Sequence, residues 1–341
     1  MIDARAACRP ELGGVERWAR EMARRLPVLR PGVYLVARPP RALVHRAGHL
    51  WEQVVLPARA ALRRAGLLYA PANLGPFAWP RNVVLVHDAA ALRHPEWYSP
   101  AYVAWQRRLL PAIVRRARHL VTVSEFSRGE LVELLGADPA RIAVIPGGVD
   151  ERFSPERDPG PALGALGLSR PYVLTVGSRL ARKNLGALEP AAAALRGEGI
   201  ELVAAGGGRP HFREAQDMPA VRALGHVPDE LLPDLYAGAR AFVLPSLYEG
   251  FGLPCIEAMA SGVPVAAAAR AALPETCGDA ALLFDPDDPA SVAAAVMRAA
   301  TDERTRERLV AAGRERTGTL SWDRAARSTD ELLVRIGGKL D

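Results

Sequence analysis

The segment "GSRLARKN", residues 177–184, holds one of only two lysines in a chain of 341 residues with 44 basic side chains. It follows the apolar run "YVLTV" and precedes a helical pattern that begins near Leu185. A loop that leaves a strand and enters a helix offers free backbone N–H groups and the positive end of a helix dipole, which attract anions. Arg179 and Lys183 add two cations four residues apart. The loop, Ser178 included, is therefore predicted to bind a diphosphate.

A second segment, "YEGFGLPCIEAMASGVPV" at 248–265, places two carboxylates eight residues apart. Glu249 is expected in a loop after an apolar strand, and Glu257 in the helix that follows. Gly250 and Gly252 allow the chain to pass close to a ligand, because glycine has no side chain. Carboxylates accept hydrogen bonds from hydroxyl groups. Together with the diphosphate loop, this pair predicts a nucleotide sugar as the ligand.

Short apolar runs alternate with helical patterns along the whole chain, which is typical of parallel sheets covered by helices. The length suits two domains of about 150 to 170 residues, each with its own core. A segment rich in Pro, Gly and charge at 149–171 is predicted to be a linker with a short helix. The expected strands lie near 33–37, 67–70, 83–86, 120–123 and 142–145 in the first half, and at 172–176, 200–205, 241–245 and 263–268 in the second.

Composition narrows the class of protein. No apolar run approaches the roughly 20 residues of a membrane span, and the N-terminus lacks the pattern of a secretory signal. The three cysteines, Cys8, Cys255 and Cys277, are odd in number and have no metal-ligand spacing, so neither a disulfide framework nor a structural zinc is expected. A cytoplasmic location is predicted.

Charge is unevenly distributed between the two halves. Residues 1–165 hold 24 arginines and 15 acidic residues, whereas residues 166–341 hold 20 basic and 23 acidic residues. The basic residues are dispersed and form no tract of like charge, so we interpret them mainly as solvated helix faces and expect no nucleic-acid partner. Peripheral contact of the basic half with a membrane stays open.

The chain resembles the retaining glycosyltransferases of the GT-B fold, specifically family 4, over nearly its whole length. The resemblance implies an α/β protein of two Rossmann-like domains that face each other across a deep cleft. The stretches that carry it are "GGVER" at 13–17, "WEQVVLP" at 51–57, "VHDAAALRHPEW" at 86–97, "VTVSEFSRGEL" at 121–131, "IPGGVD" at 145–150, "GSRLARKN" at 177–184, "GHVPDELLPDLYAGA" at 225–239, the segment of Glu249 and Glu257, "LPETCGDAALLFDP" at 273–286 and "SWDRAA" at 321–326.

The same resemblance implies a division of labour between domains. Residues 1–160 would form an N-terminal acceptor-binding domain, and residues 161–320 a C-terminal domain that binds the nucleotide sugar. Residues 321–341 would form a helix that packs back on the first domain. Two departures stand out: the first strand is expected to be short, because the chain begins "MIDARAA", and "AAARAALPE" at 267–275 lacks the small polar or Gly residues that often precede the Pro-Glu.

Four residues are carried over as catalytic: His87, Arg179, Lys183 and Glu249. The resemblance implies that Arg179 and Lys183 grip the donor diphosphate, that Glu249 contacts the donor sugar and that His87 lies beside the sugar being transferred. Glu257 would hold the ribose hydroxyls.

The remaining donor contacts implied by the resemblance involve the backbone. Amides of Gly252 and Leu253 would serve the sugar or its phosphate, and Gly13 and Gly14 would present amides to the phosphate when the cleft closes. His226 and Val227 would lie along the base.

The implied reaction is transfer of a sugar, with retained configuration and without a metal or cofactor, from a UDP- or GDP-linked donor to a hydroxyl of a small-molecule, oligosaccharide or lipid-linked acceptor. Antibiotic or polysaccharide biosynthesis is the expected setting, with UDP as the first choice of nucleotide. Two alternatives stay open: a nucleotide-sugar epimerase of similar two-domain form, and an inactive sugar-nucleotide-binding protein.

Several other patterns are interpreted as structural. Asp285-Pro286-Asp287 resembles a metal-binding Asp-x-Asp, but Asp288-Pro289 predicts the start of a helix, with Asp288 as its N-cap. Asp88 is likewise favoured as a helix cap. His45 and His49 have no third ligand for a metal, and the glycines at 206–208 lack the spacing of a nicotinamide site.

Overall fold

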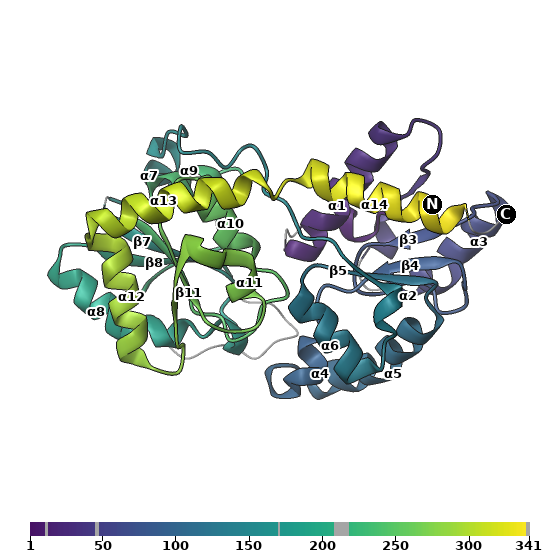
Figure 1. Ribbon diagram of the computed structural model, residues 1–341, viewed down its shortest axis with the longest axis horizontal. Coiled ribbons are helices and arrows are strands. Elements are labelled where there is room, and N and C mark those ends of the chain that lie inside the picture. Colours follow the sequence, from purple (N-terminus) through teal and green to yellow (C-terminus); the bar gives the residue numbers. More distant parts are fainter. Residues whose placement is uncertain (11–12, 45–47, 170, 208–217, 339–341) are drawn as a thin grey trace. The chain divides into compact units, whose positions relative to one another are not determined.

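The computed structural model describes residues 1–10, 13–44, 48–169, 171–207 and 218–338. The chain forms two compact units (Figure 1). Unit 1 comprises Met1–Arg93, Ala101–Gly147 and Trp322–Asp341, and unit 2 comprises His94–Pro100 and Gly148–Ser321. Each unit is described by itself.

Unit 1 is built on a six-stranded parallel sheet with the order β2-β1-β3-β4-β5-β6. Its central strands are buried on both faces, as in β4 with the sequence "NVVL", because helices cover the sheet on either side. The chain moves from β1 outward to β2 and then back to β3, so the direction of the strand order reverses between β1 and β3. The strands are β1 Ile2–Asp3, β2 Val36–Ala37, β3 Leu68–Ala70, β4 Asn82–Leu85, β5 His119–Thr122 and β6 Ile142–Val144.

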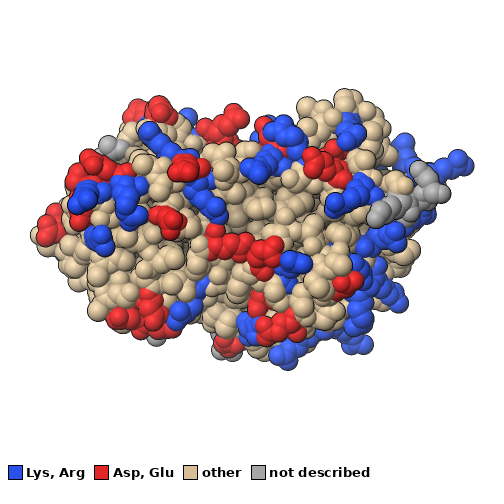
Figure 2. All heavy atoms as spheres, in the orientation of Figure 1, with Lys and Arg blue, Asp and Glu red and all other residues tan. Residues whose placement is uncertain are grey.

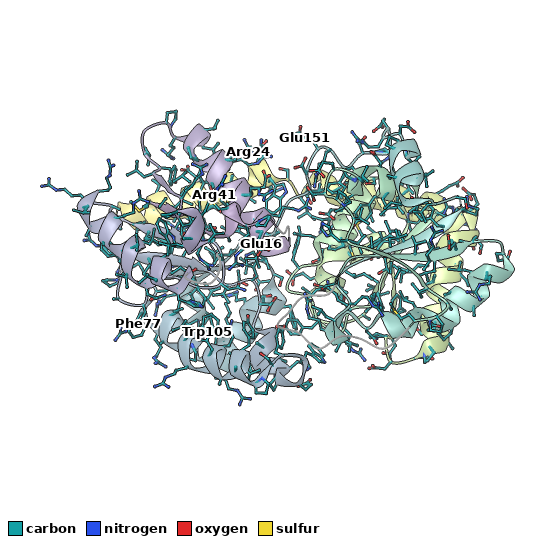
Figure 3. The ribbon with its side chains drawn as sticks, turned by 180° about the vertical axis from the view of Figure 1, so that it is seen from behind. Glu16, Arg24, Arg41, Phe77, Trp105 and Glu151 are labelled. Carbon is teal, nitrogen blue, oxygen red and sulfur yellow. The ribbon has the colours of Figure 1, made fainter. Side chains whose placement is uncertain are left out.

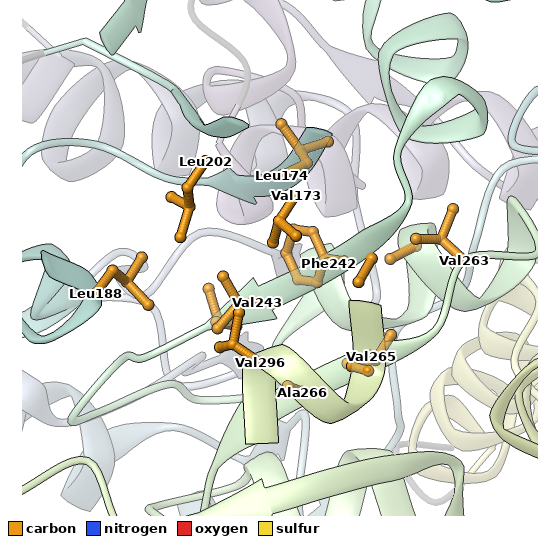
Figure 4. Packing of buried hydrophobic residues seen from close by; sticks show 14 of the residues in the cluster. Val173, Leu174, Leu188, Leu202, Phe242, Val243, Val263, Val265, Ala266 and Val296 are labelled. Carbon is orange, nitrogen blue, oxygen red and sulfur yellow. The ribbon is translucent and has the colours of Figure 1, made fainter. Parts of the chain in front are cut away.

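Unit 2 repeats this architecture with the order β12-β11-β10-β7-β8-β9. Its core joins Val173, Phe242 and Val265 from three neighbouring strands with Leu188 and Val296 from the covering helices (Figure 4). The strand order reverses between β7 and β10. The strands are β7 Tyr172–Val176, β8 Glu201–Ala205, β9 Arg222–Gly225, β10 Ala241–Leu244, β11 Val265–Ala268 and β12 Ala281–Phe284.

The longer helices follow local signals in the sequence. Ser124 caps α6, since its hydroxyl accepts the Ser127 N–H at 3.0 Å, and Gly136 ends that helix in the left-handed region at φ 60°. The helices of unit 1 are α1 Gly14–Leu29, α2 Gly48–Leu50, α3 Leu56–Leu62, α4 Ala90–Arg93, α5 Pro100–Arg116, α6 Glu125–Leu135 and α14 Trp322–Gly337. Those of unit 2 are α7 Gly160–Leu166, α8 Glu189–Gly197, α9 Leu232–Gly238, α10 Leu253–Ala260, α11 Leu273–Cys277, α12 Pro289–Thr301 and α13 Glu303–Gly318.

Helix α14 joins unit 1 although it is last in the sequence. Its Asp330 accepts hydrogen bonds from the Arg30 guanidinium at 2.8 Å and the Tyr34 hydroxyl at 2.6 Å. Trp322 packs edge-on against Trp18 of α1, with 5.5 Å between the ring centroids. The last helix is therefore held to α1 and the residues that follow it by both apolar and ionic contacts.

The α/β fold with two parallel sheets confirms the predicted fold class. All nine expected strands are present, although β2 covers only the end of the expected 33–37. Strands β1, β9 and β12 complete the sheets. Asp288 caps α12 as predicted, since its carboxylate accepts the Ala290 N–H at 2.9 Å, with Pro289 in the first turn. Within the described ranges, none of the helices combines the length and the apolar composition of a membrane span.

Candidate active site

The predicted diphosphate loop and the loop of Glu249 lie side by side in unit 2. They leave the carboxyl ends of β7 and β10, which are hydrogen-bonded neighbours in the sheet. Ligands of open α/β sheets bind at the point where the strand order reverses, because the loops diverge there and leave a crevice. A backbone hydrogen bond from the Leu247 N–H to the Arg182 carbonyl, 2.9 Å long, ties the two loops together.

The centre of this site is an ion pair between the Lys183 ammonium and the Glu249 carboxylate. Both residues are buried, with exposed fractions of 7% and 8%. Arg182 adds a second cation, since its guanidinium lies 3.3 Å from the Glu249 Oε2 and donates to the Tyr248 carbonyl at 3.0 Å. The sequence analysis assigned Lys183 and Glu249 to the site but missed Arg182.

The charges in this cluster determine the protonation states of Glu249 and Lys183. Burial alone would raise the pKa of Glu249, but the charges of Lys183 and Arg182 outweigh it and lower that pKa to about 2. Burial lowers the pKa of Lys183, and the Glu249 charge offsets part of this effect. Glu249 is therefore an anion at neutral pH, and it favours the charged form of the lysine beside it.

Two glycines, Gly177 and Gly206, allow close packing around Lys183. A Cβ at Gly177 would lie 3.3 Å from both Cδ and Cε of Lys183, so the stem of the lysine packs on the glycine backbone. Gly206, at the end of β8, has φ 143°, and a Cβ there would lie 2.0 Å from the Gly177 carbonyl oxygen. The exits of β7 and β8 therefore approach so closely that only glycine fits at 206.

Glu257 lies in α10, the helix that follows the Glu249 loop. The carboxylate is buried and accepts a hydrogen bond from the Tyr236 hydroxyl at 3.1 Å. Gly252 is the residue before the helix and adopts φ 101°, where a Cβ would lie 2.6 Å from Leu273. Leu253 is the first helical residue. The glycine allows the sharp turn that joins the Glu249 loop to α10.

The other predicted donor residues of unit 2 differ in their surroundings. Ser178 and Arg179 are half-buried in the loop between β7 and Lys183. His226 is exposed just after β9, whereas the Val227 side chain belongs to the hydrophobic core. The Val227 side chain is therefore not available to a ligand.

His87 follows β4 in unit 1 and is buried and firmly held. Its backbone N–H donates to the Asn73 Oδ1 at 2.7 Å, and its carbonyl accepts from the Ser127 hydroxyl at 3.0 Å. The ring Nε2 lies 3.2 Å from the Pro71 carbonyl oxygen, so Nε2 carries the proton and Nδ1 is the acceptor. Burial lowers the pKa of His87, which keeps the ring neutral at neutral pH.

Gly13 and Gly14 begin helix α1. The Gly13 N–H donates to the Glu16 Oε2 at 3.1 Å, and the other oxygen of Glu16 accepts from Arg9 at 3.0 Å. Figure 3 shows Glu16 at this end of the helix. The Gly13 amide therefore already has an acidic partner within the chain, and a phosphate would have to replace it.

A second buried ionic cluster lies beyond β1, where the strand order of unit 1 reverses. Asp3 accepts hydrogen bonds from the Arg5 N–H and the Trp51 indole, both at 3.0 Å. The Arg5 guanidinium pairs with Glu52, which has an exposed fraction of 0%. Burial raises the pKa of Glu52 to about 7 even though Arg5 opposes the shift. The sequence analysis did not assign this cluster.

The residues interpreted as structural behave in different ways. The Asp88 carboxylate accepts the Ala90 N–H at 3.1 Å, at the start of α4. Asp285 and Asp287 both pair with Arg270, at 3.0 and 2.7 Å. His45 and Gly208 lie outside the described residues. Among the described residues, no cluster of three or more His, Cys, Asp or Glu side chains suited to a metal ion is found.

Segments of both units match families of known proteins. Residues 170–302 match the family described as "Glycosyl transferases group 1", and residues 66–153 match "Glycosyltransferase Family 4". The chain is 33% identical to the O-antigen chain mannosyltransferase B of Escherichia coli over 74% of this chain and 70% of that protein. It is 31% identical to the MMP alpha-(1->4)-mannosyltransferase of Mycolicibacterium hassiacum, over 70% of this chain and 59% of that one.

Solved structures show the same fold at lower identity. A sucrose-phosphate synthase from Thermosynechococcus elongatus aligns with a TM-score of 0.77 and 21% identity, over 99% of both chains. The Anabaena HepE protein in complex with UDP-glucose aligns with a TM-score of 0.71 and 18% identity, over 96% of this chain and 97% of that one.

Proposed function

Because the chain belongs to the glycosyl transferases of group 1 and family 4, we propose that it moves a sugar from a nucleoside diphosphate sugar to an acceptor hydroxyl. The observation that carries this proposal is the buried Lys183–Glu249 pair with Arg182 beside it, at the point where the strand order of unit 2 reverses. It sets two cations beside the Glu249 carboxylate, and Arg179 lies in the same loop three residues before Arg182.

The cations would act on the leaving group. Negative charge grows on the diphosphate as the glycosidic bond breaks, and cations already held in place stabilise that charge more in the transition state than in the ground state. An ammonium has three N–H donors, so Lys183 has donors left for a phosphate while it contacts Glu249. This role for Arg179 and Lys183 needs no metal ion, and we propose a metal-independent reaction without a cofactor.

The carboxylates would orient the donor. Glu257, held by the Tyr236 hydroxyl, would accept hydrogen bonds from the ribose. Glu249, an anion at neutral pH, would accept from hydroxyls of the sugar. His87 would offer its unprotonated Nδ1 to a hydroxyl near the reacting centre. Gly13, Gly14, Ser178, His226, Val227, Gly252 and Leu253 would contribute mainly through their backbone.

The finer assignments follow from the family resemblance. We propose retention of configuration, with a donor phosphate oxygen taking the acceptor proton on the face from which the leaving group departs. UDP is the proposed nucleotide, with GDP as the second choice. A mannosyltransferase of O-antigen chains among the relatives favours polysaccharide assembly over antibiotic tailoring as the setting. We retain the cytoplasm as the proposed compartment.

The test is sugar transfer by the purified protein. A panel of UDP- and GDP-linked hexoses is incubated with oligosaccharide and lipid-linked acceptors, with and without EDTA, and the anomer of the product is determined by NMR. Retained configuration and full activity in EDTA are expected. Activity lost in EDTA and restored by magnesium or manganese would overturn the metal-independent mechanism. Conversion of a donor to its epimer without any acceptor would favour the epimerase instead. Absence of both reactions, with a donor still bound, would favour the inactive binding protein.

A further inference from the structure

Unit 1 has a basic pocket at the amino-terminal edge of its sheet, opposite to the edge that carries His87. The pocket has a volume of about 810 Å³. We call it the amino-edge pocket, and its charged lining consists of Arg115, Arg116, Arg118, His119, Arg141 and Arg335. These residues come from the end of α5, the start of β5, the turn before β6 and the last turns of α14.

The charge of this pocket is not balanced from within. Among the described residues, none that lines the pocket is acidic, and no ion pair joins any of its five arginines to a carboxylate. Burial lowers the pKa of His119, and the charges of Arg335 and Arg141 lower it further. Figure 2 shows basic side chains crowded on the side of the molecule formed by unit 1.

Helix geometry accounts for part of the cluster. Arg115 and Arg116 end α5, where cations offset the negative end of the helix dipole. Arg116 also lies over the Phe77 ring, 3.9 Å from its centroid, and Figure 3 labels Phe77. Arg141 donates to the Ala117 carbonyl just past the helix. Arg335 lies in the last turn of α14 and offsets the dipole of that helix in the same way, whereas Arg118 follows α5 and has no such role.

We propose that the amino-edge pocket binds a ligand that carries two or more phosphate groups. Arginine suits this chemistry, since the planar guanidinium donates two parallel hydrogen bonds to phosphate oxygens. Five arginines that converge on one concave space repel one another, and an anion of several charges removes that repulsion. The volume lies within the range of pockets for small ligands, about 300 to 1,000 Å³.

The pocket and His87 lie at opposite edges of the unit 1 sheet. Strand β5 runs from His119 at the pocket to Thr122 near the opposite edge, a span of about 10 Å at 3.3 Å per residue. A phosphate held by Arg118 and Arg335 therefore does not reach the His87 side of the sheet. The pocket would tether or regulate the protein, and the proposal holds whether or not the proposed function does.

The test uses calorimetric titration of the full chain with sodium tripolyphosphate and, for comparison, orthophosphate. The double variant Arg118→Gln/Arg335→Gln removes two arginines whose side chains make no hydrogen bond or ion pair with the described residues. The matched control, Arg107→Gln/Arg108→Gln, makes the same charge change at exposed positions of α5. We expect the pocket variant to bind tripolyphosphate at least about tenfold more weakly than the parent, and the control to stay within twofold. Equal affinity in the pocket variant and the parent would overturn the proposal, because the probe would then bind elsewhere.

A second measurement identifies the source of the phosphate. Flotation with phosphatidylglycerol vesicles, and with phosphatidylcholine vesicles as the neutral comparison, tests lipid headgroups. Binding to the anionic vesicles that the pocket variant loses and the control keeps would assign a headgroup. Tripolyphosphate binding without vesicle binding would assign a soluble ligand. Failure of both probes to distinguish the pocket variant from the control would overturn the proposal.

Discussion

Two buried glutamates, one in each unit, have pKa values shifted in opposite directions. Glu249 in unit 2 is 8% exposed and has a pKa lowered to about 2, whereas Glu52 in unit 1 is 0% exposed and has a pKa raised to about 7. Glu249 faces both Lys183 and Arg182. Glu52 pairs with Arg5, but the charge of Asp3 works against that pairing. The balance of neighbouring charge, rather than burial, separates the two carboxyl groups.

The opposite pKa shifts of Glu249 and Glu52 define two kinds of site. The Glu249 cluster is permanently charged at neutral pH and suits a ligand of fixed charge such as a diphosphate. The Glu52 cluster exchanges a proton near neutral pH, so its charge depends on the conditions. The variants that follow alter either the Glu249 cluster or the Glu52 cluster.

The largest effect on stability is expected from breaking the ion pair between Lys183 and Glu249. Glu249→Gln leaves the Lys183 ammonium buried without its strongest partner, and loss of one member of a buried ion pair costs about 3 to 5 kcal/mol. The free energy of unfolding in urea at pH 6 measures this loss. Glu52→Gln is the matched variant, and at that pH it should lose less, because the Glu52 carboxyl is then largely protonated and an amide resembles it. Equal losses would show that the two clusters do not differ as described.

Replacing Lys183 tests the same cluster through its effect on the rate of sugar transfer. Lys183→Ala should lower kcat/KM for transfer by about 2.7 to 4 kcal/mol, or roughly 100- to 1,000-fold, as when one fixed donor to developing charge is lost. Steady-state transfer from the true donor is the measurement, with the melting temperature as a check on folding. Arg304→Ala, an exposed arginine in the same unit, is the control and should change little. A Lys183→Ala enzyme within fivefold of the parent would remove the lysine from the mechanism.

The titrating side of the comparison predicts a pH dependence of stability. Because the folded pKa of Glu52 is raised to about 7 from its ordinary 4.5, its protonated form favours folding. That contribution is complete below pH 4.5 and is lost as the pH rises through 7. The parent should therefore lose about 2 to 3 kcal/mol relative to Glu52→Gln between pH 4.5 and 7.5. Urea unfolding of both proteins across this range measures it, and a constant difference would contradict the raised pKa.

The smallest effect sharpens the role of Lys183. Lys183→Arg keeps the charge but places a larger, forked group where the lysine stem already packs on Gly177. We expect kcat/KM to fall by at least about tenfold, or roughly 1.4 kcal/mol, with the fold retained. A variant that transfers sugar within twofold of the parent would show that positive charge alone is sufficient at this position.

The apolar runs of the sequence predicted nine of the strands but not β1, β9 or β12, and a short first strand was expected only from the family resemblance. Strand β9, with the sequence "RALG", lies at the edge of its sheet and is largely exposed, so it has no run of buried residues. Strand β1 has two residues, too few for any periodicity. An apolar pattern indicates which residues are buried. Strands β1 and β9 lack such a pattern and are held in place by their neighbours in the sheet.

The same limit applies to the site. The types and spacing of Lys183, Glu249 and Glu257 singled them out, but their pairing did not follow, because 66 residues separate Lys183 from Glu249 and the contact depends on β7 and β10 being neighbours. Arg182 stood inside the predicted loop, and only the path of the backbone aims it at Glu249. Tyr236 lies in a quoted motif, yet nothing local links its hydroxyl to Glu257.

The packing of the Lys183 stem on Gly177 restricts the order in which mutations could be accepted during divergence. A first step to alanine at 177 would press a methyl group against the stem at 3.3 Å, at a residue that cannot move freely because Glu249 holds its other end. A shorter residue at 183 would relieve the crowding but remove the cation. The first step crowds the lysine and the second removes its charge, so each is expected to be accepted more readily when the other position changes with it.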